Sequence, residues 1–271
     1  MMQKVLWLEV VILCFFVCSS LQEVLYANPE GTNAMECSNV ENNCSLSQAV
    51  ALAMNGDTIL LTSGRFIEET LFITDLSITI SSLNNDTEHT KLTSSGDESI
   101  FTISNSITQF SYLTFENCSN SCIIIQSDSP TSFEKCSFLN NGLTASYGGA
   151  IRSSSFIAIT DSSFIGNVIY TENAISTLGS DTAMIYGGAV YSSSANVSRT
   201  TFLNNGIMKN GDNSLLTYAY GGAIDIMQNS VIEHCVLEII LLKEDFSFIL
   251  LVVQLEAMIL LALLIFLMEI I

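Results

Sequence analysis

Residues 138–151 read FLNNGLTASYGGAI and contain the two short motifs that decide the fold, an FxxN motif and a GGA[IV] motif. Both motifs recur further along the chain, so they mark an internal repeat. An earlier copy at Phe115 has Cys118 in place of the Asn, and successive aromatic positions lie 23, 26 and 38 residues apart. The shared positions are Phe115, Phe138, Phe164 and Phe202, then Asn141, Asn167 and Asn205, then the glycine pairs Gly148 and Gly149, Gly187 and Gly188, and Gly221 and Gly222.

The segments around the motifs consist of short runs with period-two alternation, such as Leu76–Ile80 and Phe101–Ile103. Repeats made only of short strands and turns are typical of a parallel β-helix, in which each copy forms one coil. We therefore predict an all-β chain that forms one right-handed parallel β-helix over residues 28–238. The Phe residues should stack in one interior column. The Asn residues, in the left-handed conformation, should form a hydrogen-bonded ladder beside it, and the glycine pairs should form tight turns or close backbone contacts.

A helix is predicted before the first strands, because residues 45–54 read SLSQAVALAM and begin with Ser45 as a suitable N-cap. Such a helix would cover the N-terminal end of the core, where an open coil would expose apolar surface and unpaired strand edges. The alternative is an ordinary short surface helix.

The start of this region, AVALAMNGDTILLTSGRFIE at residues 49–68, resembles the beginning of pectin-lyase-like parallel β-helices. The alternating FxxN and GGA[IV] motifs resemble the repeats of polymorphic outer-membrane proteins, and the resemblance covers residues 45–238. It implies a surface-exposed β-helix that is associated with adhesion and not with catalysis.

The N-terminus predicts a secretory signal peptide over residues 1–27, because Lys4 precedes the apolar run 5–18 and polar residues follow it. Cleavage is expected near Ser19 or Ala27. A buried N-terminal strand or helix is the alternative. We expect the chain to enter the secretory pathway and to be displayed at the cell surface, held in a membrane or released outside the cell.

The C-terminal segment, residues 239–271, is hydrophobic, and Phe246–Met268 is nearly all aliphatic, broken by Gln254 and Glu256. We predict a helical segment that spans a membrane, since the apolar residues outweigh the two polar ones. Two alternatives remain open here: the truncated end of a longer solenoid and a lipid-anchor signal.

Cys37 and Cys44 are predicted to form a disulfide in the oxidising secretory pathway, and Cys118 and Cys122 offer a second short loop. A zinc site is not expected, because neither pair has CxxC spacing and the chain has only two His residues. Sequons predict glycosylation at Asn43, Asn85, Asn117 and Asn196.

The charge balance argues against nucleic-acid binding, because 8 Lys and Arg residues face 27 Asp and Glu residues, for a net charge of −19. No metal or other cofactor is expected. Arg152, Arg199, Asp161 and Asp225 are interpreted as solvated edge residues and not as a catalytic set, so no catalytic residue is assigned. The prediction is a non-enzymatic binding or adhesion module, whose partner is a cell-surface protein or glycan. A polysaccharide-active enzyme of the same fold and a structural coat protein are the alternatives.

Two segments between the Asn and the glycine pair are longer than in the shortest copy, namely Val168–Tyr186 and Gly206–Tyr220. Extra loops on a rigid scaffold often carry recognition, so these segments are the predicted binding loops. Tolerated insertions without a partner are the alternative. The loops contain Tyr170, Tyr186, Tyr218 and Tyr220, which suit contact surfaces.

Overall fold

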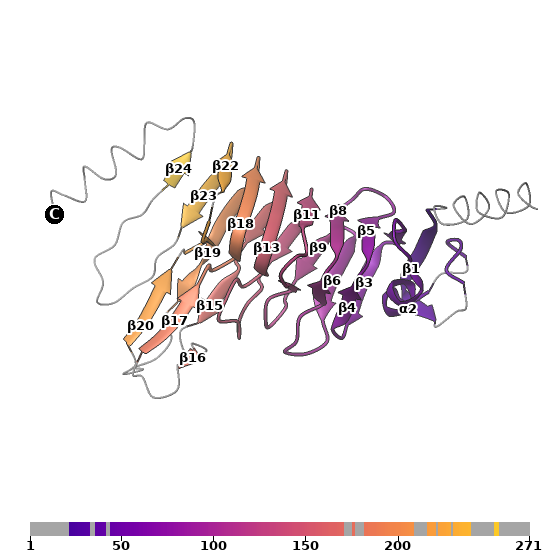
Figure 1. Cartoon of the computed structure of the whole chain (residues 1–271), viewed down its shortest axis with the longest axis horizontal. Helices are drawn as coiled ribbons and strands as arrows, with labels where there is room; N and C mark the ends of the chain where they lie inside the picture. Colours follow the sequence, from indigo (N-terminus) through magenta and orange to yellow (C-terminus); the bar gives the residue numbers. More distant parts are fainter. Residues whose placement is uncertain are drawn as a thin grey trace, which may run out of the picture.

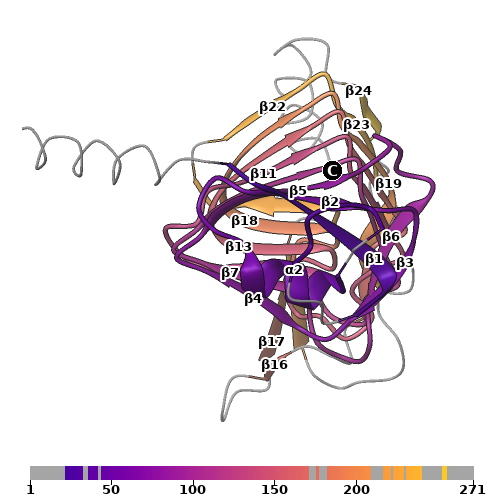
Figure 2. The ribbon, with the colours of Figure 1, turned by 90° about the vertical axis from the view of Figure 1, so that its right-hand side faces the viewer.

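The computed structural model shows a parallel β-helix, whose coils follow one another along the long axis from β1 to β22 (Figure 1). Seen from the end that carries α2, successive coils superpose around a common axis (Figure 2). The structure describes residues 22–32, 36–41, 44–170, 175–176, 182–208, 216–220, 222–228, 230–239 and 252–254.

Each coil contributes strands to two sheets, whose strands pair in parallel except for β24. The first sheet contains β1 (Val24–Thr32), β2 (Thr58–Leu61), β4 (Leu71–Thr74), β5 (Ser77–Ser82), β7 (Phe101–Ser104), β8 (Ile107–Ser111), β10 (Ile123–Ile125), β11 (Thr131–Glu134), β13 (Ile151–Thr160), β18 (Val190–Ser198), β21 (Ile224–Ile226) and β22 (Val231–Glu233). The second contains β3 (Gly64–Glu68), β6 (Thr90–Ser94), β9 (Thr114–Glu116), β12 (Ser137–Leu139), β14 (Ser163–Ile165), β15 (Val168–Tyr170), β19 (Thr201–Met208), β23 (Val236–Ile239) and β24 (Val252–Gln254).

The Phe residues of the repeat form one interior column, because the strands that carry them pair in register. The rings of Phe115, Phe138, Phe164 and Phe202 are stacked, with centroids of successive rings 4.9, 4.5 and 4.8 Å apart, and all four are buried. The same register adds Phe66 and Leu92 before the column, which the motif search missed, and it places Leu237 after the column.

The Asn residues form the ladder beside this column. Asn141 Nδ2 donates to Asn167 Oδ1 at 2.9 Å, and Asn167 Nδ2 donates to Asn205 Oδ1 at 2.8 Å. All three side chains are buried, and each Nδ2 also donates to the backbone oxygen of a Phe in the preceding coil. At its N-terminal end the ladder meets Cys118, whose backbone N–H donates to Asn141 Oδ1 at 2.9 Å.

The ladder residues were predicted to adopt the left-handed conformation, and this is wrong by one position. The residue just before each ladder Asn has the positive φ instead. Asn140 and Asn204 have φ of 54° and Gly166 has φ of 68°. The turn must bend before the ladder so that the following amide points inward, which explains the shift.

The glycine pairs allow neighbouring coils to approach closely. Gly148 and Gly187 have φ of 52° and 59°, and a Cβ at Gly188 would lie 2.0 Å from the oxygen of Gly222. The backbone nitrogen of Gly149 donates to Gly188 O at 3.0 Å, so the pairs bond directly from coil to coil. Gly221 lies outside the described residues.

The predicted N-terminal helix corresponds to α2 (Leu46–Leu52), which is shorter than expected because Ala53 is extended. The Ser45 hydroxyl accepts a hydrogen bond from the Gln48 backbone at 3.2 Å. Leu46, Ala49 and Val50 are buried and belong to the main core. Both predicted disulfides, Cys37–Cys44 and Cys118–Cys122, are present.

The signal-peptide boundary at Ala27 stays a prediction, and it would fall inside β1. Val24–Ala27 pair with β2, and Leu25 and Ala27 are buried in the core, so removal of residues 1–27 would strip the first strand of its buried positions. Cleavage near Ser19 would preserve that strand. Residues 1–21 lie outside the described residues, and the signal peptide itself stays a prediction.

The C-terminal segment was predicted to be helical. This prediction is wrong for the few residues of the segment that the structure describes. Val252–Gln254 form β24, which pairs antiparallel with β23. Most of Phe246–Met268 lies outside the described residues. No helix among the described residues is long and apolar enough to span a membrane.

Candidate functional site

The outer face of the first sheet carries a row of chemically different side chains at one repeat position. Arg152 on β13 is in register with Tyr191 on β18, which is in register with Asp225 on β21. Each follows the Ile or Val of a GGA[IV] motif, which packs against the core, so the alternation of the strand points it outward. Within a constant scaffold, this position therefore varies from a cation to a phenol to a carboxylate.

A second row of tyrosines lies beside the first. The Tyr147 and Tyr186 rings stack with centroids 5.1 Å apart and planes within 7°. Tyr191 packs against both, with centroids 5.2 Å from Tyr147 and 5.6 Å from Tyr186. We name this set the tyrosine platform: Tyr147, Tyr186 and Tyr191, with Arg152 and Asp225 at its sides.

Charged groups border the platform on two sides. The Arg152 guanidinium lies over the Tyr147 ring, 4.8 Å from its centroid, and the Tyr191 hydroxyl donates to Met227 Sδ at 2.9 Å. Burial raises the pKa of Tyr191, and Tyr147 and Asp225 add to this effect. Burial also raises the pKa of Asp225. The platform thus offers partly exposed aromatic area between a cation and a partly desolvated carboxyl group.

The platform was only partly visible in the sequence. Tyr186 was among the predicted residues, whereas Tyr147 and Tyr191 were missed, and Arg152 and Asp225 were treated as edge residues. One signal was present: a tyrosine directly precedes the glycine pair in each copy, at Tyr147, Tyr186 and Tyr220. The structure places Tyr220 in register with Tyr186 through the pairing of β17 and β20, and its side chain is not described.

The predicted binding loops contain strands in the structure. β15 (Val168–Tyr170) pairs with β19, while β16 (Ile175–Ser176), β17 (Thr182–Tyr186) and β20 (Leu216–Tyr220) form a third sheet at one side of the helix (Figure 1). Extra residues inserted at the same corner of successive coils can pair with each other, which explains the strands. A second small core supports them, made of Ala145, Ile169, Ile185 and Ile207.

Tyr170 ends β15, and Tyr218 lies on β20 in register with Met184. Of the four predicted tyrosines, Tyr186 is the one whose ring the structure places in the platform.

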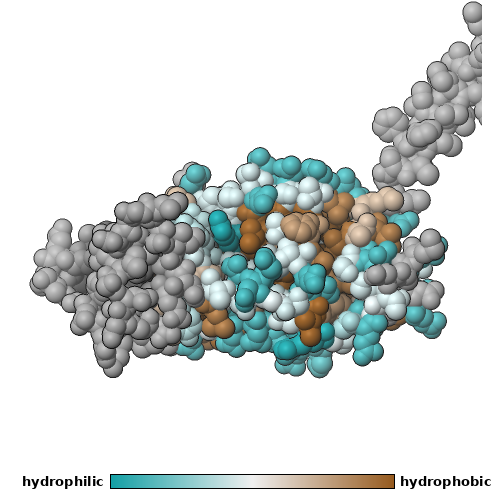
Figure 3. Space-filling model, turned by 90° about the horizontal axis from the view of Figure 1, so that it is seen from below, coloured by the Kyte–Doolittle hydropathy of each residue, from teal (hydrophilic) through white to brown (hydrophobic). Residues whose placement is uncertain are grey.

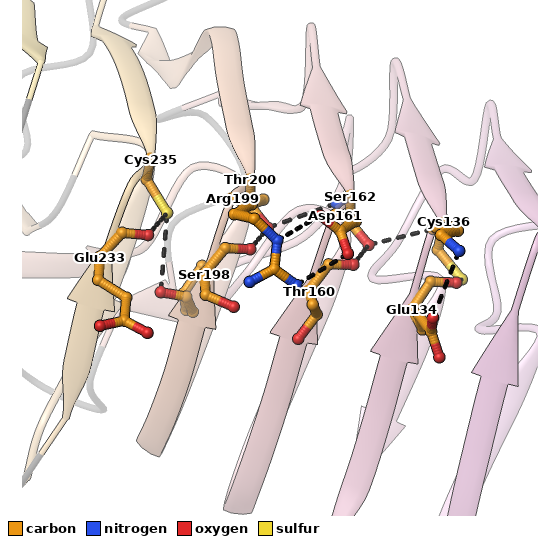
Figure 4. Close-up of polar contacts among 12 residues, drawn as sticks. Glu134, Cys136, Thr160, Asp161, Ser162, Ser198, Arg199, Thr200, Glu233 and Cys235 are labelled. Atoms are coloured by element: carbon orange, nitrogen blue, oxygen red, sulfur yellow. Dashed lines mark hydrogen bonds and ion pairs between the residues drawn. The ribbon is translucent and has the colours of Figure 1, made fainter.

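A different corner carries the other predicted edge residues (Figure 4). Arg199 donates from Nε and Nη2 to the two Asp161 carboxylate oxygens at 2.6 and 2.9 Å, and this hydrogen bonding lowers the pKa of Asp161. One coil away, Lys135 Nζ donates to Tyr112 Oη at 2.9 Å. These four residues all have positive φ, so they share one turn position in successive coils.

The residue after each turn at this corner points inward. Cys136, Ser162, Thr200 and Cys235 are buried, and the Ser162 hydroxyl accepts from the Cys136 backbone at 3.1 Å while donating to Thr160 O at 2.8 Å. Cys136 and Cys235 are free thiols, and burial raises the pKa of Cys136 to about 12. A thiol this basic is not a nucleophile at neutral pH.

A third charged group lies on the second sheet. Glu116 is buried and forms ion pairs with Arg65 and with Lys91, whose Nζ is 3.5 Å from Glu116 Oε2. On the same sheet, burial raises the pKa of Glu68 to about 7. The positive charges of Arg65 and Lys91 are therefore partly neutralised by the buried Glu116 carboxylate.

The outer face of the first sheet also has a shallow groove of about 300 Å³, lined by residues that include Ile107, Gln109, Pro130 and Phe156. On the underside of the molecule, hydrophobic side chains lie interspersed with polar ones (Figure 3).

Within the described ranges, no three His, Cys, Asp or Glu side chains are grouped closely enough to hold a metal ion. Asn85, Asn117 and Asn196 are exposed, and Asn43 lies outside the described residues.

No protein-family model and no curated protein matches the chain. Among solved structures, the chain is similar to the crystal structure of pectate lyase Pel9A, with a TM-score of 0.34 and 13% sequence identity over 80% of each chain. The similar protein is a pectate lyase, and we withdraw the expectation that the chain has no catalytic activity. The likeness concerns the fold alone.

Proposed function

We propose that the chain is a secreted or surface-displayed β-helix that binds a cell-surface protein or glycan through the tyrosine platform. The platform carries the proposal, because it combines stacked, partly exposed aromatic rings with a cation and a carboxyl group on rigid strands. Tyrosines supply a large contact area at a low cost in conformational entropy, and they are enriched in protein interfaces.

The strand-bearing segments beside the platform extend the same surface. Their small core fixes β15 and β17 against the helix, so a partner would meet a preformed face and little ordering would be lost on binding. The finer resemblance to polymorphic outer-membrane proteins supports this role, since the FxxN and GGA[IV] motifs build the column, the ladder and the turns that display the platform. The right-handed sense of the helix and the role of α2 as a cap on its core belong to the same proposal.

The proposal is tested with Tyr191→Ala and Arg152→Ala, measured for binding to cultured cells and to a glycan array. Lys135→Ala is the matched control, because Lys135 also lies over a tyrosine ring, 5.0 Å from the Tyr112 centroid, on a different corner. We expect both platform variants to lose at least tenfold in affinity, and the control to bind like the parent. Melting temperatures show whether each variant is folded.

Equal binding by a folded Tyr191→Ala variant would reject the platform as the contact surface. The same preparations are incubated with acidic and neutral polysaccharides to detect new chain ends. Cleavage that Asp225→Asn abolishes would replace the binding role with a catalytic one, and ligand-independent self-association would favour a structural coat.

A further inference from the structure

A row of outward-facing side chains crosses the first sheet from β5 to β18. The strands pair in the order β5, β8, β11, β13 and β18 (Figure 1). Their register aligns one outward residue of each strand with the next, namely Thr79, Gln109, Ser132, Ala158 and Asn196. The last member is the acceptor of the sequon Asn196-Val197-Ser198, and its side chain is exposed. A predicted modification site therefore stands at one end of this row.

The shallow groove on this face follows the same row. Its lining includes the four members that precede Asn196 in the row. One side of the groove is apolar and consists of the residues two positions before the row, at Ile107, Pro130 and Phe156. Neighbouring strands are about 4.8 Å apart, so the groove crosses about 14 Å from β13 to β5. It begins beside Asn196 and runs away from it along the axis of the β-helix.

The lining of the groove suits a neutral saccharide. Every residue that lines it is uncharged, and the apolar side faces the amide of Gln109 and the hydroxyl of Ser132. Sites for small molecules commonly combine apolar area with a few polar groups that fix the orientation of the ligand. A sugar ring offers both kinds of surface, its C–H faces and its hydroxyls. The net charge of −19 disfavours an acidic saccharide in the same place.

The register leaves the path from Asn196 into the groove open. Ala158 is the residue opposite Asn196 on the neighbouring strand, and its side chain is a single methyl group. A sugar attached to Asn196 Nδ2 would therefore lie next to the groove without a bulky side chain between them. Such a tethered group is present at a high effective concentration, so weak contacts are enough to hold it. A volume of about 300 Å³ limits the groove to the first sugars of a glycan.

We propose that Asn196 carries an N-linked glycan whose first sugars, neutral N-acetylglucosamine residues, lie in this groove against Ile107, Pro130 and Phe156. The donor is a lipid-pyrophosphate-linked oligosaccharide. The bond between Asn196 Nδ2 and the sugar C1 forms, the bond from C1 to the pyrophosphate breaks, and the proton lost by the amide balances the charge of the released lipid pyrophosphate. The proposal rests on the predicted secretory route and not on the tyrosine platform, whose variants are tested by partner binding.

The modification is tested on the full chain, produced in a eukaryotic secretory host. Enzymatic release of N-glycans in heavy-oxygen water converts each occupied Asn into a labelled Asp, which peptide mass spectrometry detects. We expect label at Asn196 in the parent and in Ser198→Thr, which keeps the sequon, and none in Ser198→Ala. An unlabelled Asn196 in the parent would overturn the proposal, whatever the platform variants bind.

The position of the glycan is tested by the rate at which a peptide N-glycosidase releases it from folded protein. Ala158→Trp fills the groove beside Asn196, and we expect release at least tenfold faster than from the parent. Ser137→Trp is the matched control, a half-buried small residue on the outer face of the second sheet, and should release the Asn196 glycan at the rate of the parent.

Equal release rates from the parent and a folded Ala158→Trp protein would overturn the proposal and leave the groove to a free saccharide or a second copy of the chain. If Ala158→Trp does not fold, the double variant Ile107→Ala and Phe156→Ala replaces it. This variant removes most of the apolar side of the groove, so release should again be faster than from the parent, and an unchanged rate would overturn the proposal.

Discussion

The interior Phe column and the exterior tyrosine platform are both stacks of aromatic rings at the spacing of successive coils. Phe138 and Phe164 are 4.5 Å apart and fully buried, while Tyr147 and Tyr186 are 5.1 Å apart and partly exposed. The coil register produces both stacks, and the direction of the side chain decides what each stack does. The inner stack contributes to folding, and we propose that the outer stack contributes to binding.

The largest effect is expected from breaking the inner stack. Phe164→Ala removes a ring that stacks on Phe138 and Phe202, and we expect a loss of about 3–5 kcal/mol in the free energy of unfolding. Urea denaturation measures it. Tyr191→Ala is the matched exterior control. If the Phe164→Ala protein unfolds at the same urea concentration as the parent, the Phe column does not stabilise the packing of the coils.

The pH dependence of stability tests a polar group beside the inner column. Glu68 lies two residues after Phe66 on β3, and burial raises its pKa from 4.5 to about 7 in the folded protein. The folded state therefore favours the neutral carboxyl: this stabilisation is complete below about pH 4.5 and is lost as the pH rises through about 7. The full difference corresponds to at most about 3 kcal/mol, less what solvent screening removes.

Glu68→Gln should remove this part of the pH dependence, which unfolding curves between pH 4.5 and 8 will show. Glu88→Gln, at an exposed carboxyl, is the control and should keep the slope of the parent. An identical slope in the Glu68→Gln protein would mean that Glu68 titrates normally.

The Asn ladder should have an intermediate effect. Asn167→Ala leaves the buried Asn141 amide without its acceptor at Asn167 Oδ1, so we expect a loss of about 1–3 kcal/mol. Asn204→Gly is the control, because Asn204 is exposed with φ of 54° and glycine adopts that conformation easily. Similar urea midpoints for the two variants would contradict a stabilising ladder.

The smallest effect on folding is expected at the outer stack. Tyr191→Ala removes two ring contacts that are partly exposed to solvent, and we expect a loss of about 1 kcal/mol. Thermal unfolding measures this loss against that of Phe164→Ala. A loss as large as that at Phe164 would assign the tyrosines to structure and weaken the binding proposal.

The candidate site was less predictable than the scaffold that carries it. Tyr186 was named because it ends an expanded segment, but the reason it matters is its stacking on Tyr147, which precedes the glycine pair of another coil. Likewise, Arg152 and Asp225 are 73 residues apart in the sequence, and only the register of β13, β18 and β21 places them on the two sides of Tyr191.

By itself, the sequence determined the repeat, the parallel β-helix, the Phe column, the Asn ladder and the Cys37–Cys44 disulfide, because these depend on spacings that recur within short stretches. Only the tertiary structure decided the first buried strand at Val24–Thr32, the position of the left-handed turn residues, the strands in the expanded segments and the tyrosine platform. The physical reason is that contacts between coils depend on the summed lengths of all turns and strands between them, so a difference of one residue reverses which face a side chain occupies.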